Sequence, residues 1–321
     1  MKLYITIDGG TTNTRVSLIC DGQLLDTVRI PLGARAGIDG TQALKDALRE
    51  AISDLLREHS LTEADVCRVL ASGMITSEFG LCALPHLQAP VGIAELHANM
   101  HDATFAEITS IPFTFIRGVK MLGDTLDSTD MMRGEETELM GLASSSDGEC
   151  LYILPGSHSK LVETDRNGRI VRFSTMLTGE MIAALSSGTI LKDAVDLSVT
   201  ELCEKKLLEG CRYATEHGIN EALFKVRILK NLFSATTVEC YSFFLGAILS
   251  AEVDAIARSP IQTIVIGGKA QLKRATALLL QAMTAKKILS LSDEEVEASV
   301  SNGMIRVYEF DAQAEKRITK G

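Results

Sequence analysis

The sequence predicts an α/β protein of two lobes, in which each mixed sheet begins with an antiparallel meander and is flanked by helices. A pattern of strand, polar loop, strand, turn and strand opens the chain, and the same pattern recurs near residue 150. Elsewhere, strands alternate with periodic helices. Because the repeats open two near-equal halves, we interpret them as an internal duplication. The predicted lobes are residues 1–145 and 146–321.

Length and composition exclude several classes of protein. A chain of 321 residues favours two domains, each large enough for its own core. The net charge of -10, without a local Lys/Arg cluster, argues against a nucleic-acid partner. Seven cysteines occur without a C-x-x-C pair, which fits a reducing cytosol. The run from Tyr241 to Ala251 is too short to span a bilayer. We expect a cytoplasmic protein with a small-molecule partner and no membrane partner; a homodimer stays open.

The first meander places a polar loop after a buried strand. Leu3 to Ile7 run into Asp8, and a second apolar run from Val16 to Cys20 follows. Glycines let backbone N–H groups approach a phosphate, and threonine hydroxyls add donors. Asp8 is placed to hold Mg²⁺ through water. A plain hairpin with a Gly-Gly turn is the alternative for this motif alone. The predicted phosphate-binding residues are Gly10, Thr11, Thr12 and Asn13.

The second meander repeats this chemistry from Leu151 onward. A strand leads into a Gly-Ser loop, and a turn at 165–168 precedes a third strand from Ile170 to Ser174. Two such loops in facing lobes would hold a polyphosphate chain, which predicts a nucleotide-binding protein. Lys160 could neutralise phosphate charge or simply be solvated. The candidates in this loop are Gly156, Ser157, Ser159 and Lys160.

The other elements of the first lobe follow from periodicity. A helix is predicted from Thr41, its N-cap, to His59. A buried strand over 66–71 leads into Ser72-Gly73-Met74. Residues 85–90 are predicted as a loop, and a strand over 113–116 ends at Arg117, where strand-end ligands usually lie. A helix is predicted within 131–142, with Glu135 and Glu136 in its first turn.

The second lobe is predicted to be richer in helix. Thr178 is expected to cap a helix that ends at Ser187, and residues 198–257 are mainly helical. A buried strand over 261–266 ends in Gly267-Gly268, where a planar base could lie close to the backbone. This predicts contact with adenosine; a plain strand–helix turn is the alternative. A strand over 287–291 and a helix over 294–302 complete the lobe.

Three blocks resemble the 2-dehydro-3-deoxygalactonokinases of the sugar-kinase, Hsp70 and actin superfamily. The blocks are Met132 to Thr137, Leu154 to Lys160 and Met176 to Glu180, in the family's order. The resemblance covers nearly the whole chain. It implies an actin-like ATPase fold, ATP and Mg²⁺ as cofactors, and phosphorylation of the terminal hydroxyl of 2-dehydro-3-deoxy-D-galactonate to give the 6-phosphate. Gly9 stands where the family commonly has Trp, and the segment after Gly73 also departs from the pattern. A kinase of another sugar or sugar acid therefore stays open.

The resemblance also implies roles for site residues. In related sugar kinases the base lies at the start of the helix before the second meander, so we favour Glu135, with Glu136 next. Adjacent helical residues point about 100° apart, so only one can face the reaction centre. Arg133 would grip the substrate or the phosphoryl group. Gly73 and Met74 would contact substrate, and Arg35, then Arg117, would bind its carboxylate. An actin-like regulatory ATP-binding protein is the alternative of another class.

Overall fold

The computed structural model describes residues 2–35, 40–142, 148–268 and 270–311. The chain forms two compact units. The first comprises the N-terminal stretch as far as the second meander, together with Asp165–Arg172 and the chain from Glu294 onward. The second comprises Gly148–Thr164 and Phe173–Asp293. The predicted lobe boundary at 145/146 and the predicted loop positions 36 and 37 lie outside the described residues.

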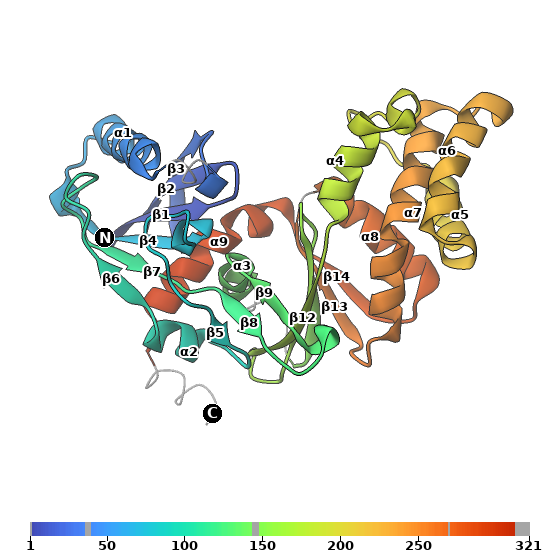
Figure 1. The fold of residues 1–321 in the computed structure, drawn as a ribbon. Coiled ribbons are helices and arrows are strands. Elements are labelled where there is room, and N and C mark those ends of the chain that lie inside the picture. The colour runs from blue at the N-terminus through green and yellow to red at the C-terminus, as the bar shows by residue number, and fades with distance from the viewer. Residues whose placement is uncertain (1, 36–39, 143–147, 269, 312–321) are drawn as a thin grey trace. The chain divides into compact units, whose positions relative to one another are not determined.

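The first unit contains the predicted N-terminal meander in a six-stranded sheet (Figure 1). The strand order is β3-β2-β1-β4-β7-β6. The meander is antiparallel throughout, whereas β1, β4 and β7 run parallel to one another. The strands are β1 (Leu3–Gly9), β2 (Thr14–Cys20), β3 (Gln23–Ile30), β4 (Val66–Gly73), β7 (Phe113–Phe115) and β6 (His101–Ala103).

One face of this sheet packs against α1 (Gln42–Glu58), which confirms the predicted helix. Its leucines and Ile52 join the inward side chains of β1, β2 and β4 in one apolar cluster. The predicted cap residue Thr41 does occupy the N-cap position, but its side chain makes no capping hydrogen bond. Its φ of -86° and ψ of 0° are helical, whereas capping side chains normally sit on extended backbone.

The other face carries α3 (Glu135–Leu142) and α9 (Asp293–Tyr308). Glycines allow the two helices to touch, because a Cβ at Gly141 would lie 1.9 Å from Ser299 O, and one at Gly303 would lie 1.9 Å from Thr137 O. Thr6 of β1 also bonds Ser301 of α9 through their hydroxyls at 2.8 Å. From Glu294 onward the last helix thus belongs to the first unit, whereas the predicted C-terminal lobe, residues 146–321, included it.

A small sheet and a short helix complete the first unit. The sheet has the order β5-β8-β9, with β5 (Leu87–Gln88), β8 (Val119–Met121) and β9 (Asp130–Met132). Helix α2 covers Ile93–Ala98. Residues 131 and 132 lie in a strand, because they pair with β8, and the predicted helix begins after them at Glu135. The loop predicted over 85–90 likewise contains the short strand β5.

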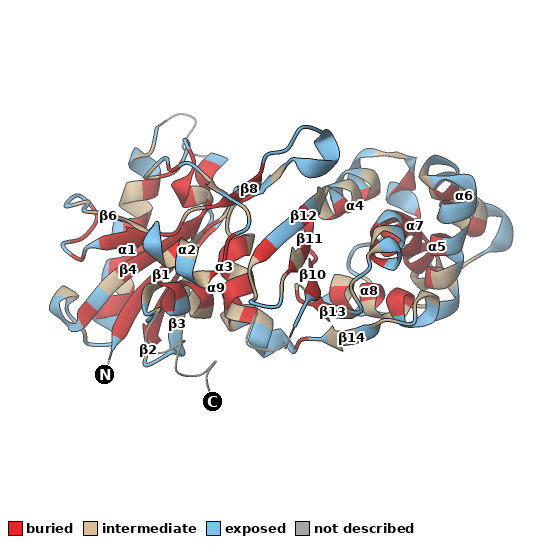
Figure 2. Ribbon diagram, turned by 90° about the horizontal axis from the view of Figure 1, so that it is seen from below, coloured by how far each residue is buried: buried red, intermediate tan, exposed pale blue. Residues whose placement is uncertain are grey.

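The predicted second meander is part of a five-stranded sheet of order β12-β11-β10-β13-β14, which belongs to the second unit except for the start of β12, up to Arg172. Strand β11 pairs antiparallel with β10, β12 lies next to β11, and β13 joins β10 in parallel. Figure 2 colours the central strands largely as buried. The strands are β10 (Cys150–Leu154), β11 (Ser159–Thr164), β12 (Ile170–Met176), β13 (Thr263–Ile266) and β14 (Lys287–Ser290).

Helix α7 (Thr237–Arg258) is the core helix of the second unit. By length and composition it could cross a membrane, but 78% of its apolar window is buried by the rest of the protein. Helix α5 packs closely on it, since a Cβ at Gly210 would lie 2.0 Å from Phe243 O. The other helices are α4 (Thr178–Gly188), α5 (Glu204–His217), α6 (Ile219–Phe233) and α8 (Ala270–Met283).

The predicted cap at Thr178 is wrong. Leu177 occupies the N-cap position of α4, and Thr178 lies in the first turn with 4% of its surface exposed. Its hydroxyl donates to the Glu252 carboxyl of α7 instead of accepting from the helix backbone. A tertiary contact therefore fixes this side chain, which no local sequence pattern reveals.

Candidate functional site

In the first unit, the ends of three parallel strands bring predicted site residues into one row. Asp8 of β1 lies opposite Ser72 of β4, and Gly9 lies opposite Gly73. Strand β7 runs parallel to β4 on its other side, and Arg117 follows its end after one residue. Ligands of open α/β sheets usually bind at this carboxyl edge.

Glycines bring the start of α3 to the same edge. A Cβ at Gly73 would lie 2.5 Å from Gly9 O, and one at Gly134 would lie 3.3 Å from the Gly73 Cα. Gly73 has a φ of +85° and Gly134 a φ of +112°, so both backbones favour glycine as well. The backbone segments at Gly9, Gly73 and Gly134 are far apart in sequence but pack directly on one another. We call this arrangement the glycine stack.

The first polar loop is a tight turn with exposed side chains. Gly10 N donates to Asn13 O at 2.9 Å, and the side chains of Thr11, Thr12 and Asn13 are exposed. The segment that carries Arg35 lies on this loop, because Arg35 N donates to Thr11 O at 3.0 Å. The backbone at Arg35 therefore lies beside the loop, and the Arg35 side chain is exposed.

The adjacent carboxylates at the start of α3 have different surroundings. Glu136 is fully buried and accepts from Gly134 N at 2.8 Å and from Thr137 Oγ1 at 3.0 Å. Burial is the main cause that raises the pKa of Glu136 to about 7, and the negative charge of Glu135 raises it further by a smaller amount. Ser72 Oγ lies 2.6 Å from Thr137 Oγ1, which joins β4 to this group. Glu135, in contrast, is partly exposed.

Arg133 uses its guanidinium to hold the segment that follows Met74. Its Nη1 donates to Thr76 O at 2.7 Å, and its Nη2 donates to Leu84 O at 3.1 Å. Nη2 also lies 3.3 Å from His86 Nδ1. Burial is the main cause that lowers the pKa of His86 to about 4, and the positive charge of Arg133 is the second cause. This imidazole is therefore neutral at pH 7. The structure therefore places Arg133 in contacts with the protein's own backbone.

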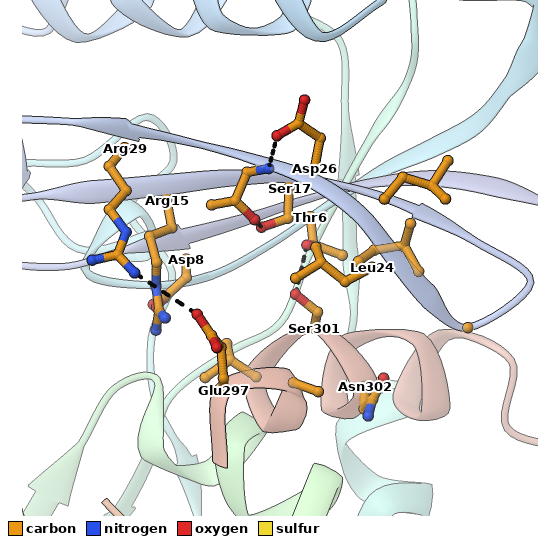
Figure 3. A pocket seen from close by; sticks show the side chains of 16 residues that line it. Thr6, Asp8, Arg15, Ser17, Leu24, Asp26, Arg29, Glu297, Ser301 and Asn302 are labelled. Carbon is orange, nitrogen blue, oxygen red and sulfur yellow. Dashed lines mark hydrogen bonds and ion pairs between the residues drawn. The ribbon is translucent and has the colours of Figure 1, made fainter. Parts of the chain in front are cut away.

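Asp8 faces α9 across a pocket of about 390 Å³ (Figure 3). Arg15 Nη2 and Nε donate to Asp8 Oδ2 at 2.8 and 3.2 Å. Glu297 and Ser301 of α9 line the opposite wall. Within the part of the chain that the structure describes, three or more Asp, Glu, His or Cys side chains are nowhere gathered in a metal-binding group.

The second polar loop is fastened to the start of α4. Gly179 N donates to Gly156 O at 3.2 Å and to Ser157 O at 3.1 Å. Ser157 is exposed, whereas Ser159 is fully buried and Lys160 is 4% exposed. Lys160 Nζ donates to Thr175 Oγ1 of β12 at 2.7 Å, so the alternative of a solvated lysine is wrong.

The Gly267-Gly268 turn packs on this loop. Gly267 N donates to Ile153 O at 2.9 Å. Gly268 has a φ of +75°, and a Cβ there would lie 2.5 Å from Pro155 O. The second glycine thus allows close contact between two backbone segments of the second unit, and the turn lies beside Gly156.

Comparison with known proteins gives the family. The sequence matches the 2-keto-3-deoxy-galactonokinase family over residues 8–307. The chain belongs to this family. A 2-dehydro-3-deoxygalactonokinase of Escherichia coli (strain K12) is 28% identical over 82% of this chain and 85% of its own length. A relative from Rhizobium meliloti (strain 1021), assigned the same activity, is 26% identical over 93% and 95%.

Solved structures confirm the predicted fold. A Sinorhizobium meliloti protein proposed to be a 2-dehydro-3-deoxygalactonokinase has a TM-score of 0.76 at 22% identity, over 96% of this chain and 100% of its own. Component A of the (R)-2-hydroxyglutaryl-CoA dehydratase of Acidaminococcus fermentans has a TM-score of 0.52 at 12% identity, over 96% and 98%. The chain therefore has the actin-like sugar-kinase fold, and as a member of its family it is a kinase of carbohydrate metabolism.

In this 2-keto-3-deoxy-galactonokinase family member, the structure adds Glu138 to the residues that the sequence singles out. The residue as a whole is partly exposed, but desolvation of its carboxyl raises the pKa of Glu138 to about 8, and the charges of Glu135 and Asp8 act in the same direction. Arg15 acts in the opposite direction. The spacing of three residues from Glu135 puts both on one helix face, and this spacing is the signal that could have identified Glu138.

Proposed function

We propose that the chain phosphorylates the terminal hydroxyl of 2-dehydro-3-deoxy-D-galactonate with ATP and gives the 6-phosphate, as a cytoplasmic enzyme of D-galactonate catabolism. The observation that carries this proposal is the glycine stack, which brings the Arg133–Glu136 segment to the strand ends beside Asp8. Membership of the family supports the reaction and the relatives' names support the substrate.

Glu135 is the proposed general base. It is partly exposed at the first position of α3, whereas Glu136 is fully buried and bonded to Gly134 and Thr137. A base must reach the hydroxyl proton of the substrate, which a fully enclosed carboxyl does not allow. Glu136 would instead fix the turn that presents Glu135.

The hydroxyl-bearing loops of both units are the proposed phosphate sites. Gly10 and the exposed side chains of Thr11, Thr12 and Asn13 offer donors in the first, and Gly156 and Ser157 in the second. Both Arg15 bonds end on Oδ2 of Asp8, so Oδ1 can accept from water bound to Mg²⁺, an ion that keeps most of its water shell. Bound Mg²⁺ would neutralise phosphate charge during transfer. Ser159 and Lys160 support the second loop from inside the unit.

Arginine is the proposed ligand of the substrate carboxylate. Arg117 is partly exposed, and within the described part of the chain its buried Nε has no hydrogen-bond partner. It follows the end of β7, at the sheet edge where β4 ends in Gly73, the residue before Met74. Arg35 is the second candidate, since its segment lies on the first loop. Arg117→Ala should raise KM for the sugar acid at least tenfold, because a charge-assisted carboxylate bond is lost.

The reaction is tested by ADP release with Mg·ATP and a panel of acceptors. The panel contains 2-dehydro-3-deoxygalactonate, its gluconate epimer and neutral hexoses. We expect turnover to be highest with the galactonate acid and close to background without an acceptor. Turnover confined to another acceptor would keep the kinase and reject the proposed substrate. Binding of ATP without turnover on any member would reject the proposed reaction.

The assignment of the base is tested by two matched variants. Glu135→Gln should lower kcat by about 10²–10⁴-fold with little change in either KM, because general-base catalysis is worth about that much. Glu136→Gln keeps the shape of the buried carboxyl and serves as the comparison, with a smaller loss of kcat. A larger loss in Glu136→Gln than in Glu135→Gln would reverse the assignment.

A further inference from the structure

A buried carboxyl in the second unit has no role in the proposed mechanism. Glu252 lies on the core helix α7 and is 1% exposed. Its helical neighbours at one and four residues' distance, Val253 and Ile256, are buried apolar side chains. Burial raises the pKa of the Glu252 carboxyl. A carboxyl at such a place costs folding free energy unless its partners compensate.

The partners of Glu252 come from the two segments that define the second phosphate loop. Thr178, the first residue of α4, donates its hydroxyl to Glu252 Oε1. Ser159, the first residue of β11, lies close enough for its hydroxyl to lower the pKa of Glu252. Ser159 Oγ and Glu252 Oε2 are nevertheless both buried without a hydrogen bond of normal geometry to any described residue. A small movement that pairs them would satisfy two buried polar atoms at once.

These contacts lie directly beneath the loop. Gly179 and Glu180, which follow Thr178, donate their backbone N–H groups to loop carbonyls at 3.1 to 3.2 Å. A Cβ at Gly179 would lie 2.5 Å from Gly156 O, so α4 and the loop are in backbone contact. His158 of the loop also bonds Glu180 through Nε2 and Oε1 at 2.9 Å. Glu252 is therefore bonded to the helix on which the loop rests, and it lies close to Ser159, the residue that follows the loop.

We propose that Glu252 is a positioning residue for nucleotide binding. Its buried carboxyl fixes the position of the second polar loop against α4, through Ser159 and Thr178. It touches no substrate itself. The inference rests on the proposed function, in which Gly156 and Ser157 bind nucleotide phosphate. Loss of the carboxyl would remove the acceptor of the buried Thr178 hydroxyl and the carboxyl that lies close to Ser159, and we expect the loop to shift with these two side chains.

Three variants and one control test this inference in the full-length protein. Glu252→Leu removes both acceptors at similar volume, and Thr178→Val removes one donor with its shape kept. Glu252→Gln retains an acceptor and serves as the conservative rescue. The control is Asp254→Asn, which changes an exposed carboxyl two residues away on α7 that forms an ion pair with Arg258.

The readouts are direct binding of Mg·ATP without sugar acid, and KM for each substrate together with kcat. We expect Glu252→Leu and Thr178→Val to weaken ATP binding at least tenfold, with KM for the sugar acid within twofold. Glu252→Gln should recover most of the affinity, and Asp254→Asn should match wild type. A merely structural role would not move ATP affinity selectively.

Distinct results separate the two levels of the proposal. If wild type binds ATP and both Thr178→Val and a folded Glu252→Leu bind it equally well, the positioning role is refuted and the proposed function stands. Thr178→Val decides the matter in the same way if Glu252→Leu does not fold. If wild type itself does not bind Mg·ATP, the proposed function fails and this inference fails with it.

Discussion

The crossing of α3 and α9 predicts a loss of stability when Gly303 becomes alanine. The added Cβ would lie 1.9 Å from Thr137 O, whereas ordinary contacts begin near 3.4 Å, so the helices must separate locally by roughly 1.5 Å. Overpacking of this kind costs about 1–3 kcal/mol. Alanine regains up to about 1 kcal/mol through its helix propensity. The net loss should be about 1–2 kcal/mol, which lowers Tm by about 1.5–3 °C for a chain of 321 residues.

The same change should reach the chemistry, because α3 begins with Glu135. We expect kcat of Gly303→Ala to fall several-fold at temperatures where the variant is folded. Thermal unfolding followed by circular dichroism gives Tm, and the ADP-release assay gives kcat. Gly188→Ala is the matched control, because an added Cβ at this helical glycine meets nothing within 4 Å. A Tm for Gly303→Ala at or above that of wild type would refute the packing argument.

Three further changes test other parts of the structure. Glu138→Gln should stabilise the protein more at pH 9 than at pH 5. With a native pKa of about 8, the Glu138 carboxyl is protonated in the folded protein at pH 5, whereas at pH 9 it is ionised and destabilises the fold, and glutamine stays neutral at both pH values. Equal differences in Tm between variant and wild type at the two pH values would contradict this. Gly73→Ala should lower kcat/KM at least tenfold, because Gly73 has a φ of +85° and an added Cβ would lie 2.5 Å from Gly9 O. Full activity of this variant in steady-state kinetics would show that the backbone segments at Gly9 and Gly73 are not in such close contact. Thr236→Ala removes the N-cap that accepts from Glu239 N at 3.2 Å and should lower the free energy of unfolding by about 1 kcal/mol in urea. An unchanged urea midpoint would show that this cap contributes nothing.

Local sequence determined much of the framework of this protein. Alternating strands, polar turns and a helix with a regular apolar stripe fix their own conformation, so both meanders and α1 lie where the pattern predicts them. The polar loops between meander strands likewise follow from glycine and hydroxyl residues at the turn. The first part of the candidate site could thus be proposed from residues 8–13 alone.

Only the tertiary structure decided how distant segments use their side chains. Equal carboxylates at positions 135 and 136 differ in burial because β4 and Thr137 enclose one of them. Arg133 bonds a segment more than forty residues away in sequence, and Glu252 bonds Thr178. Gly141 and Gly303 bring α9 to the first unit after the whole second unit has intervened. Such contacts join residues without a shared local period, so no window of sequence contains them, and they form only when the packed units bring the segments together.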